Sequence, residues 1–476
     1  MITIKIHDNS LKLIDLIILM LLTVSSMVSF ITCAINETIV EGYQYIYILP
    51  ICFIIFNIFL YIRIVKFNNI GKVTVLIFTF IQWLRLVILP LVGCSSGYFS
   101  QYGRFVDFNS ANVAVVMMAY EAIITSIFAF IIFETSIKMH LEKKSNKTFK
   151  LYGSKKIYWI FILIAFTLFL GTGANKFHFF VLKLSDERVS TTLGNAGNAL
   201  DAIIDYGLII LMVVILYYCY THYNNKHNKK FFYIALSISL LRMCLLSSEG
   251  RMSQIYLLGI FLLLLPNLFP QHKKTIYKCI ILISALVLGL MTIYKTFYAF
   301  LYDSYLDAIK ANSMNLKDVS SQIDIYFYGL KTVARNITYT NASDLNVFQS
   351  ILDILKNTFG IHYAFRNQFS TVEFYNLYLY SGSETSGHLF SSLAYGILYF
   401  GKIFAPMVSC FNVFLAFQFE KLLSKINYLD IYYIVALVFT RFSLSIFSNF
   451  PQTWNVVSRT IIISFFVIFG SKLLKK

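Results

Sequence analysis

The sequence is short of charged residues and of proline. Only 13% of its 476 residues are Asp, Glu, Lys or Arg and six are proline, whereas 58% are hydrophobic. Soluble globular proteins carry roughly 25% charged and about 45–50% apolar residues. A water-soluble fold could not bury so much apolar surface. The composition therefore excludes a soluble multidomain protein and predicts a chain that consists mostly of membrane-spanning helices.

Cysteine, acidic residues and processing signals are also scarce. The seven cysteines are scattered and mostly lie in apolar runs, so we interpret them as buried small side chains and expect neither a disulfide framework nor a metal site. No signal-peptide cleavage pattern follows the first apolar run. The net charge of +17 would suggest nucleic acid on a soluble protein, but on a membrane protein its sidedness sets the orientation instead.

Apolar runs of the length needed to cross a bilayer recur along the chain. We predict an all-α, polytopic integral membrane protein with about twelve transmembrane helices. The spans are expected at 12–34, 44–62, 73–93, 113–135, 157–174, 203–221, 231–247, 252–269, 277–294, 402–420, 429–448 and 456–472. Alternate connections are rich in Lys and Arg, which cytoplasmic loops retain. This pattern predicts a multi-pass protein with both termini in the cytoplasm.

The predicted spans divide the chain into three regions. Residues 1–294 form a nine-helix region with a hairpin whose outer tip is 247–251, residues 295–401 form a long external loop, and 402–476 hold the last three spans and a basic terminus. Within the loop, 344–359 has the apolar spacing of an amphipathic helix that lies on the outer leaflet or roofs a cavity, with Asp344 as its N-cap and Gly360 as its stop. The small residues that follow His388 predict a short or re-entrant helix.

Arginine is the main cation near the predicted outer surface. Its planar guanidinium binds phosphate or carboxylate with two hydrogen bonds and keeps its charge when buried. Arginines that converge from separate loops would hold a diphosphate or an acidic sugar; the alternative is that each one extends to lipid headgroups or pairs with a nearby acid. The candidates are Arg251, Arg335 and Arg366, with Arg104, Arg188 and Arg459 as secondary ones.

Histidine supplies the candidate bases of the external side. Imidazole accepts a proton from a sugar hydroxyl near neutral pH, although a single histidine is more often a packing residue. His388 stands out because it lies in Thr-Ser-Gly-His directly before a stretch of small residues and glycines, and His362 is a secondary candidate. No external loop has an Asp-x-Asp pair, so we expect no metal-dependent nucleotide-sugar chemistry and no metal site.

The layout resembles the Wzy-type polymerases that assemble O-antigen and capsular repeat units. The shared features are the length, the number of spans, the Ser-Glu-Gly-Arg hairpin tip at 248–251, the long external loop before the last three spans, and the small-residue and aromatic stretch 391–401 that ends in Phe-Gly. The resemblance covers most of the chain and rests on short, degenerate motifs.

The resemblance implies a reaction at the outer face of a bacterial cytoplasmic membrane. A hydroxyl of one polyprenyl-diphosphate-linked repeat unit would attack the anomeric carbon of a second lipid-linked glycan, and polyprenyl diphosphate would leave, with no cofactor. By the same resemblance Arg251 matches the hairpin arginine, His388 resembles the histidine of related ligases, and Glu384 is the alternative base. Arg335 and Arg366 match loop arginines by location only.

The resemblance also implies the partners: lipid-linked glycans and membrane lipids, with a chain-length regulator and a flippase as further candidates and no nucleic acid. Three other functions stay open. One is another polyprenyl-phosphate glycosyltransferase, but such enzymes usually carry an acidic pair in the first external loop, where this chain offers only Glu37 and Glu41. A flippase for the same lipids would need two related halves and polar residues along a central passage, whereas this chain places one long polar loop on one side. A receptor or assembly protein without catalysis is compatible with the large loop alone.

Overall fold

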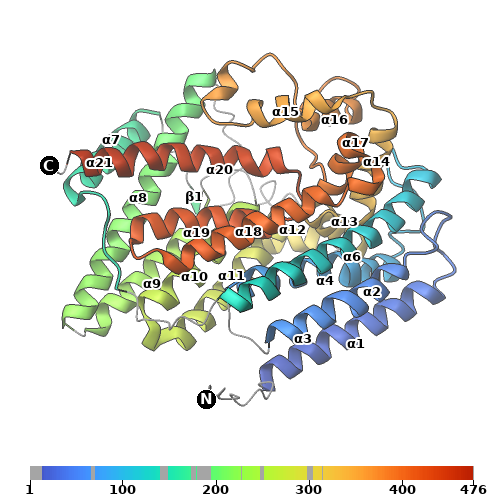
Figure 1. The fold of residues 1–476 in the computed structure, drawn as a ribbon, viewed down its shortest axis with the longest axis horizontal. Helices are drawn as coiled ribbons and strands as arrows, with labels where there is room; N and C mark the ends of the chain where they lie inside the picture. Colours follow the sequence, from blue (N-terminus) through green and yellow to red (C-terminus); the bar gives the residue numbers. More distant parts are fainter. Residues whose placement is uncertain are drawn as a thin grey trace. The chain divides into compact units, whose positions relative to one another are not determined.

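The structure is a computed structural model that describes residues 13–65, 70–139, 148–172, 178–179, 194–226, 228–246, 251–296, 304–312 and 315–474. Its described part is almost entirely helical (Figure 1). The exception is a two-residue antiparallel ladder between β1, His178–Phe179, and β2, Leu245–Leu246. The predicted helical fold class is confirmed.

The helices follow one another with short connections. The first group is α1 Leu13–Ile35, α2 Ile48–Cys52, the π-helix η1 Phe53–Ile58, α3 Phe59–Val65, α4 Lys72–Trp83, the π-helix η2 Leu84–Ile88, α5 Leu89–Ser95 and α6 Phe108–Met139. The second is α7 Lys155–Thr172, α8 Gly194–Lys226, α9 Lys229–Cys244, α10 Arg251–Leu268, the 3-10 helix η4 Pro270–His272 and α11 Lys273–Thr296. The third is α12 Tyr305–Ala311, α13 Leu316–Phe327, α14 Leu330–Asn341, α15 Val347–Lys356, the 3-10 helix η6 Ile361–Tyr363 and α16 Thr371–Leu379. The last is α17 Ser392–Phe404, α18 Met407–Lys425, α19 Leu429–Leu444, α20 Phe450–Ser464, the π-helix η7 Phe465–Phe469 and α21 Gly470–Leu473.

Several of these helices have the length and apolar character of membrane spans. By these two criteria five qualify in the described part of the chain: Asp15–Ile35, Lys72–Ser95, Phe108–Ser136, Ala202–Lys226 and Phe450–Leu473. Two sharply bent pairs raise the number to seven if each pair is one span: Ile255–Leu268 with Pro270–Val287, and Ser392–Phe404 with Met407–Lys425. Each predicted span overlaps a helix, but α9 and α19 have only 16 residues each. The total of twelve therefore stays a prediction.

The chain folds into two compact units. The first consists of Met1–Glu142, Asn315–Lys421 and Phe442–Asn455, and the second of Lys143–Met314, Leu422–Arg441 and Val456–Lys476. Both units combine early and late parts of the sequence, so they cut across the order-based regions 1–294, 295–401 and 402–476. Most of the long loop belongs to the first unit.

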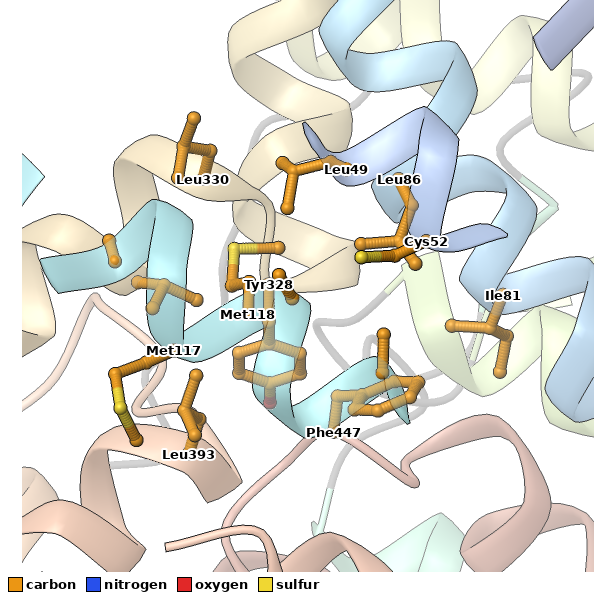
Figure 2. Close-up of a cluster of buried hydrophobic side chains, with 14 of the residues drawn as sticks. Leu49, Cys52, Ile81, Leu86, Met117, Met118, Tyr328, Leu330, Leu393 and Phe447 are labelled. Carbon is orange, nitrogen blue, oxygen red and sulfur yellow. The ribbon is translucent and has the colours of Figure 1, made fainter. Parts of the chain in front are cut away.

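The long loop contributes to the hydrophobic core of the first unit. Tyr328, between α13 and α14, has a left-handed backbone with φ of 54°. Figure 2 shows its ring among Met118, Leu393 and Phe447. Its hydroxyl donates to Ser448 Oγ at 2.8 Å. The loop is therefore anchored to the helices that precede and follow it in the sequence.

A buried ion pair also anchors the long loop to the preceding helices. Arg85 of η2 lies 3.0 Å from Glu121 of α6, and the two side chains are 1% and 0% exposed. Arg85 Nε donates to the Tyr328 carbonyl at 3.1 Å, and Glu121 accepts from Ser409 at 2.5 Å. An ion pair in apolar surroundings needs such additional hydrogen bonds to offset its desolvation. This network makes the pair a structural link between the membrane helices and the loop.

The predicted amphipathic helix is shorter than expected. The sequence predicts 344–359 with Asp344 as N-cap, but α15 begins at Val347 and its cap is Asn346, whose side chain accepts from Gln349 N at 3.3 Å. Asp344 is exposed. The prediction of the cap was wrong because both residues can cap a helix and only the backbone turn selects between them. Gly360 follows with φ of 86°.

Candidate functional site

The site is built around α14, whose start is fixed by a buried acid. Asp324 of α13 accepts hydrogen bonds from Thr332 N at 2.8 Å, Thr332 Oγ1 at 2.6 Å and Lys331 N at 3.2 Å. Gly329, the N-cap residue, offers no side chain to do this. A Cβ added at Gly329 would lie 2.4 Å from Asp324 Oδ2, so the glycine allows the carboxylate to approach. Asp324 thus satisfies the first-turn donors from a neighbouring helix.

Lys331, a further cation of the long loop, has a structural role at the start of α14. Its side chain is buried, its Nζ donates to the Tyr98 carbonyl, and the same nitrogen lies 3.9 Å from the centroid of the Tyr98 ring. Burial lowers the pKa of Lys331 to about 8, against the opposing effect of Asp324. Lys331 therefore holds α14 to the turn that follows α5.

Arg335 lies one turn further along α14 and is half-buried. Its Nε is buried and donates no hydrogen bond to any residue that the structure describes. A methyl group added at Gly103 would lie 3.6 Å from Arg335 Nη2, so the guanidinium reaches the 103–105 turn. In that turn Arg104 is exposed and its Cζ lies 4.7 Å from the centroid of the Phe105 ring. Two predicted arginines, Arg335 and Arg104, thus come from separate segments to one region.

His388 belongs to the same region. Burial lowers the pKa of His388, and the positive charges of Arg335 and Arg104 lower it further. Each of these effects disfavours the imidazolium. These surroundings therefore favour the neutral imidazole of His388, which has a ring nitrogen able to accept a proton.

Two asparagines hold the backbone around His388. Asn376 of α16 accepts from His388 N at 2.8 Å and donates to His388 O at 3.1 Å. Asn336 of α14 accepts from Ser391 N at 2.9 Å and donates to Leu389 O at 3.3 Å. The segment 388–391, which leads into α17, is consequently fixed between α14 and α16.

Aromatic rings line this region. Tyr339 contacts Tyr375 and Tyr378, each with ring centroids 5.5 Å apart, and Tyr378 lies 5.4 Å from Phe105. The Tyr380 ring lies 5.6 Å from that of His388. Tyr339 and Tyr375 are buried, so of these tyrosines only the partly exposed Tyr378 and Tyr380 have faces that can contact the apolar face of a sugar.

The segment after His388 forms a bent helix pair. Ser391 caps α17 by accepting from Ala394 N at 3.2 Å, and α17 and α18 differ in direction by 108°. A Cβ at Gly396 would lie 2.2 Å from the Ala405 carbonyl oxygen, and Gly401 has φ of 75°. The sequence predicts a short or re-entrant helix here, and the bend is that of a broken span or a re-entrant loop.

The other predicted residues are exposed, make contacts elsewhere or lie outside the described residues. Arg366 is exposed, and His362 stacks near Tyr363 with centroids 4.0 Å apart. Glu384 is exposed on the 381–387 turn. Arg366 and His362 belong to the segment that follows α15, and Glu384 lies four residues before His388.

Three further arginines lie elsewhere in the chain. Arg459 pairs with Asp205 at 3.7 Å within the second unit. Arg251 begins α10 in that unit, but its side chain and the tip residues 247–250 lie outside the described residues, as does Arg188. The predicted joint clamp of Arg251, Arg335 and Arg366 therefore stays a prediction.

The residues that sequence reasoning missed are Asp324, Asn336 and Asn376. Each is buried and each uses its side chain to fix a backbone that carries Arg335 or His388. One signal was available for Asp324, because acids are rare in this chain. The asparagines sit in ordinary helical contexts, and no local pattern marks them.

Comparison with models of protein families, with curated proteins and with solved structures finds no match to this chain. Among the residues that the structure describes, no three or more His, Cys, Asp and Glu side chains form a group that could hold a metal ion. The function has to be argued from the geometry of the Arg335–Arg104–His388 region, which we call the loop site.

Proposed function

We propose that the protein polymerises polyprenyl-diphosphate-linked oligosaccharide repeat units into a surface polysaccharide, such as O-antigen or capsule, at the outer face of a bacterial cytoplasmic membrane. The observation that carries the proposal is that His388, Arg335 and Arg104 come together on a loop that is anchored to the preceding helices. The proposal includes twelve spans with both termini in the cytoplasm.

The loop site offers the two functions that the transfer needs. The acceptor hydroxyl gives its proton to His388 as its oxygen bonds to the donor's anomeric carbon, and the bond from that carbon to the diphosphate oxygen breaks. General base catalysis requires a neutral base within hydrogen-bond reach of the hydroxyl. Arg335 and Arg104 stabilise the negative charge of the leaving diphosphate, which prearranged cations do without reorganisation.

The surroundings of the Arg335 guanidinium fit this role. A guanidinium used only for structure would have its donors satisfied within the protein. Arg85 is such a case, since Glu121, the Tyr328 carbonyl and the Phe447 ring surround it. Arg335 instead retains a buried Nε without a hydrogen bond to a described residue and lies near a second cation. An anion between Arg335 and Arg104 would relieve their repulsion.

Helix α15 supplies a surface for the lipid part of the substrate. Its apolar residues Val347, Phe348 and Ile351 are 53%, 61% and 50% exposed. The opposite face is held to the protein because Asp353 accepts from Thr371 N at 2.9 Å. The Trp454 indole, in the first turns of the candidate span Phe450–Leu473, donates to Thr358 Oγ1 at 2.8 Å. This contact ties α15 to the start of that candidate span, which supports an interfacial position for the helix.

Reconstitution separates polymerase from flippase. The full-length protein in liposomes receives lipid-linked repeat units in the outer leaflet and no nucleotide, and the products are sized on a gel. A ladder of repeat lengths supports polymerisation. Movement of intact lipid between leaflets without chain growth would show a flippase and overturn the proposal.

A further inference from the structure

Two cysteines that are far apart in the sequence meet at one end of the first helices. Cys33 lies near the end of α1 and Cys94 near the end of α5, with their Sγ atoms 3.3 Å apart. Their side chains are 2% and 3% exposed. A disulfide bond is about 2.04 Å long, so the sulfur atoms would have to approach by only about 1.3 Å.

The backbones on which these cysteines lie are held in a fixed register. Ser25 Oγ accepts from Trp83 Nε1 at 2.9 Å, and Ser29 Oγ donates to the Val87 carbonyl at 2.9 Å. Asn36 Nδ2 donates to the Cys94 carbonyl at 2.9 Å. In each of the three pairs the residue numbers differ by 58. The two segments thus run parallel, and hydrogen bonds on both sides of Cys33 keep the sulfur atoms facing each other.

This end of the helices is the end that carries the loop site. Tyr98 lies four residues after Cys94, and its carbonyl accepts the hydrogen bond from Lys331 of α14. In the proposed function this side is extracytoplasmic. Disulfides form and persist in such oxidising compartments, whereas cytosolic thiols stay reduced.

We infer that Cys33 and Cys94 form a disulfide that joins α1 to α5 beside the loop site. The inference rests on the proposed function only for the sidedness of these helix ends. The oxidant is a protein or small-molecule disulfide of the extracytoplasmic space. The thiolate of one cysteine attacks that disulfide and releases one thiol; the second cysteine then displaces the other sulfur. Two protons and two electrons leave the chain, one S–S bond forms and the acceptor's S–S bond breaks.

The burial of the two sulfur atoms determines when this exchange takes place. Neither sulfur is accessible to a protein oxidant once α1 is packed. The exchange therefore takes place before α1 closes on α5, and the finished bond is protected from reductants. The link ties α1 to α5, the helix that leads into the loop site, in addition to the hydrogen bonds and apolar contacts that already hold α1.

Mass spectrometry of the full-length protein tests the inference. Membranes are dissolved in denaturant with excess alkylating reagent at harvest, and the protein is digested without reduction. The expected result is a Cys33 peptide linked to a Cys94 peptide, two hydrogens lighter than the separate peptides and separable by reduction. Cys33→Ser and Cys94→Ser should abolish it, while Cys52→Ser, a change at a buried cysteine of the same unit, should leave it intact.

Recovery of both residues as alkylated thiols, or a link from either one to a different cysteine, would overturn the inference. The wild-type result decides the matter even if a serine variant fails to accumulate. Failure of the polymerase proposal is distinguishable, because the linked peptide is measured without any activity. A reduced pair in a protein that forms ladders would refute the disulfide alone.

Discussion

Replacing Asp324 by alanine tests how the loop site is positioned. The carboxylate accepts three hydrogen bonds from the first turn of α14, from Thr332 N, Thr332 Oγ1 and Lys331 N. A hydrogen bond to a charged group contributes about 1.5–3 kcal/mol. The three bonds therefore set an upper limit of about 5–9 kcal/mol on the loss if the group is ionised.

The net loss should be smaller than this limit. Burial raises the pKa of Asp324, so the folded protein already bears a cost for that carboxylate, and alanine removes the cost. The freed donors of α14 also gain access to water when the helix opens. We expect α14 to lose about 2–4 kcal/mol of local stability, within the range for buried hydrogen-bonded groups. Hydrogen exchange in 330–341 should then accelerate between about 30-fold and about 1000-fold, because 1.4 kcal/mol corresponds to a factor of ten.

Hydrogen–deuterium exchange with mass spectrometry measures this effect peptide by peptide. The matched control is Asp318→Ala on the same helix, where the side chain is exposed and does not cap α14. Ladder formation should fall with Asp324→Ala because Arg335 is displaced. Unchanged protection of 330–341 would refute the view that Asp324 fixes the start of α14.

Three further predictions follow from other parts of the structure. The pKa of His388 should lie below the ordinary histidine value of about 6.5, and Arg335→Gln should raise it, because the change removes a cation; an NMR titration of His388 with the same midpoint in wild type and Arg335→Gln would contradict this. Gly396→Ala should destabilise the protein by about 1–3 kcal/mol through overpacking against backbone, whereas Gly470→Ala, with no atom within 4 Å of the added Cβ, should change its thermal unfolding little; equal melting temperatures would contradict the close approach. Phe348→Trp, with the native tryptophans kept, should add fluorescence relative to the parent protein, and brominated lipids should quench that added signal if α15 lies in the bilayer interface; an unquenched added signal would place this face elsewhere.

Sequence patterns predicted the helices well because membrane spans and amphipathic faces are local properties. The run that predicts 113–135, for example, lies within α6, Phe108–Met139. Boundaries were less accurate where neighbouring residues compete for one role. Asp344 and Asn346 can both cap a helix, and the turn geometry selected Asn346.

Contacts between distant segments could not be predicted from local patterns. Neither the spacing nor the composition of the cysteines indicates that Cys33 faces Cys94, because that contact depends on the register of two packed helices. Similarly, the sequence marks Arg335 and His388 separately, but their proximity depends on Asn336 and Asn376. Arg366 looked equivalent to Arg335 as a loop arginine, yet it lies exposed beyond η6.

The most direct test of the central claim compares the initial rate of ladder formation in liposomes for wild type, Arg335→Gln, His388→Asn and the control Lys310→Gln. Lys310 is an exposed cation of the same long loop, outside the loop site. The account predicts that the first two variants lose the ladder at equal protein abundance and that Lys310→Gln retains it. Ladders at the wild-type rate from both Arg335→Gln and His388→Asn would contradict the account.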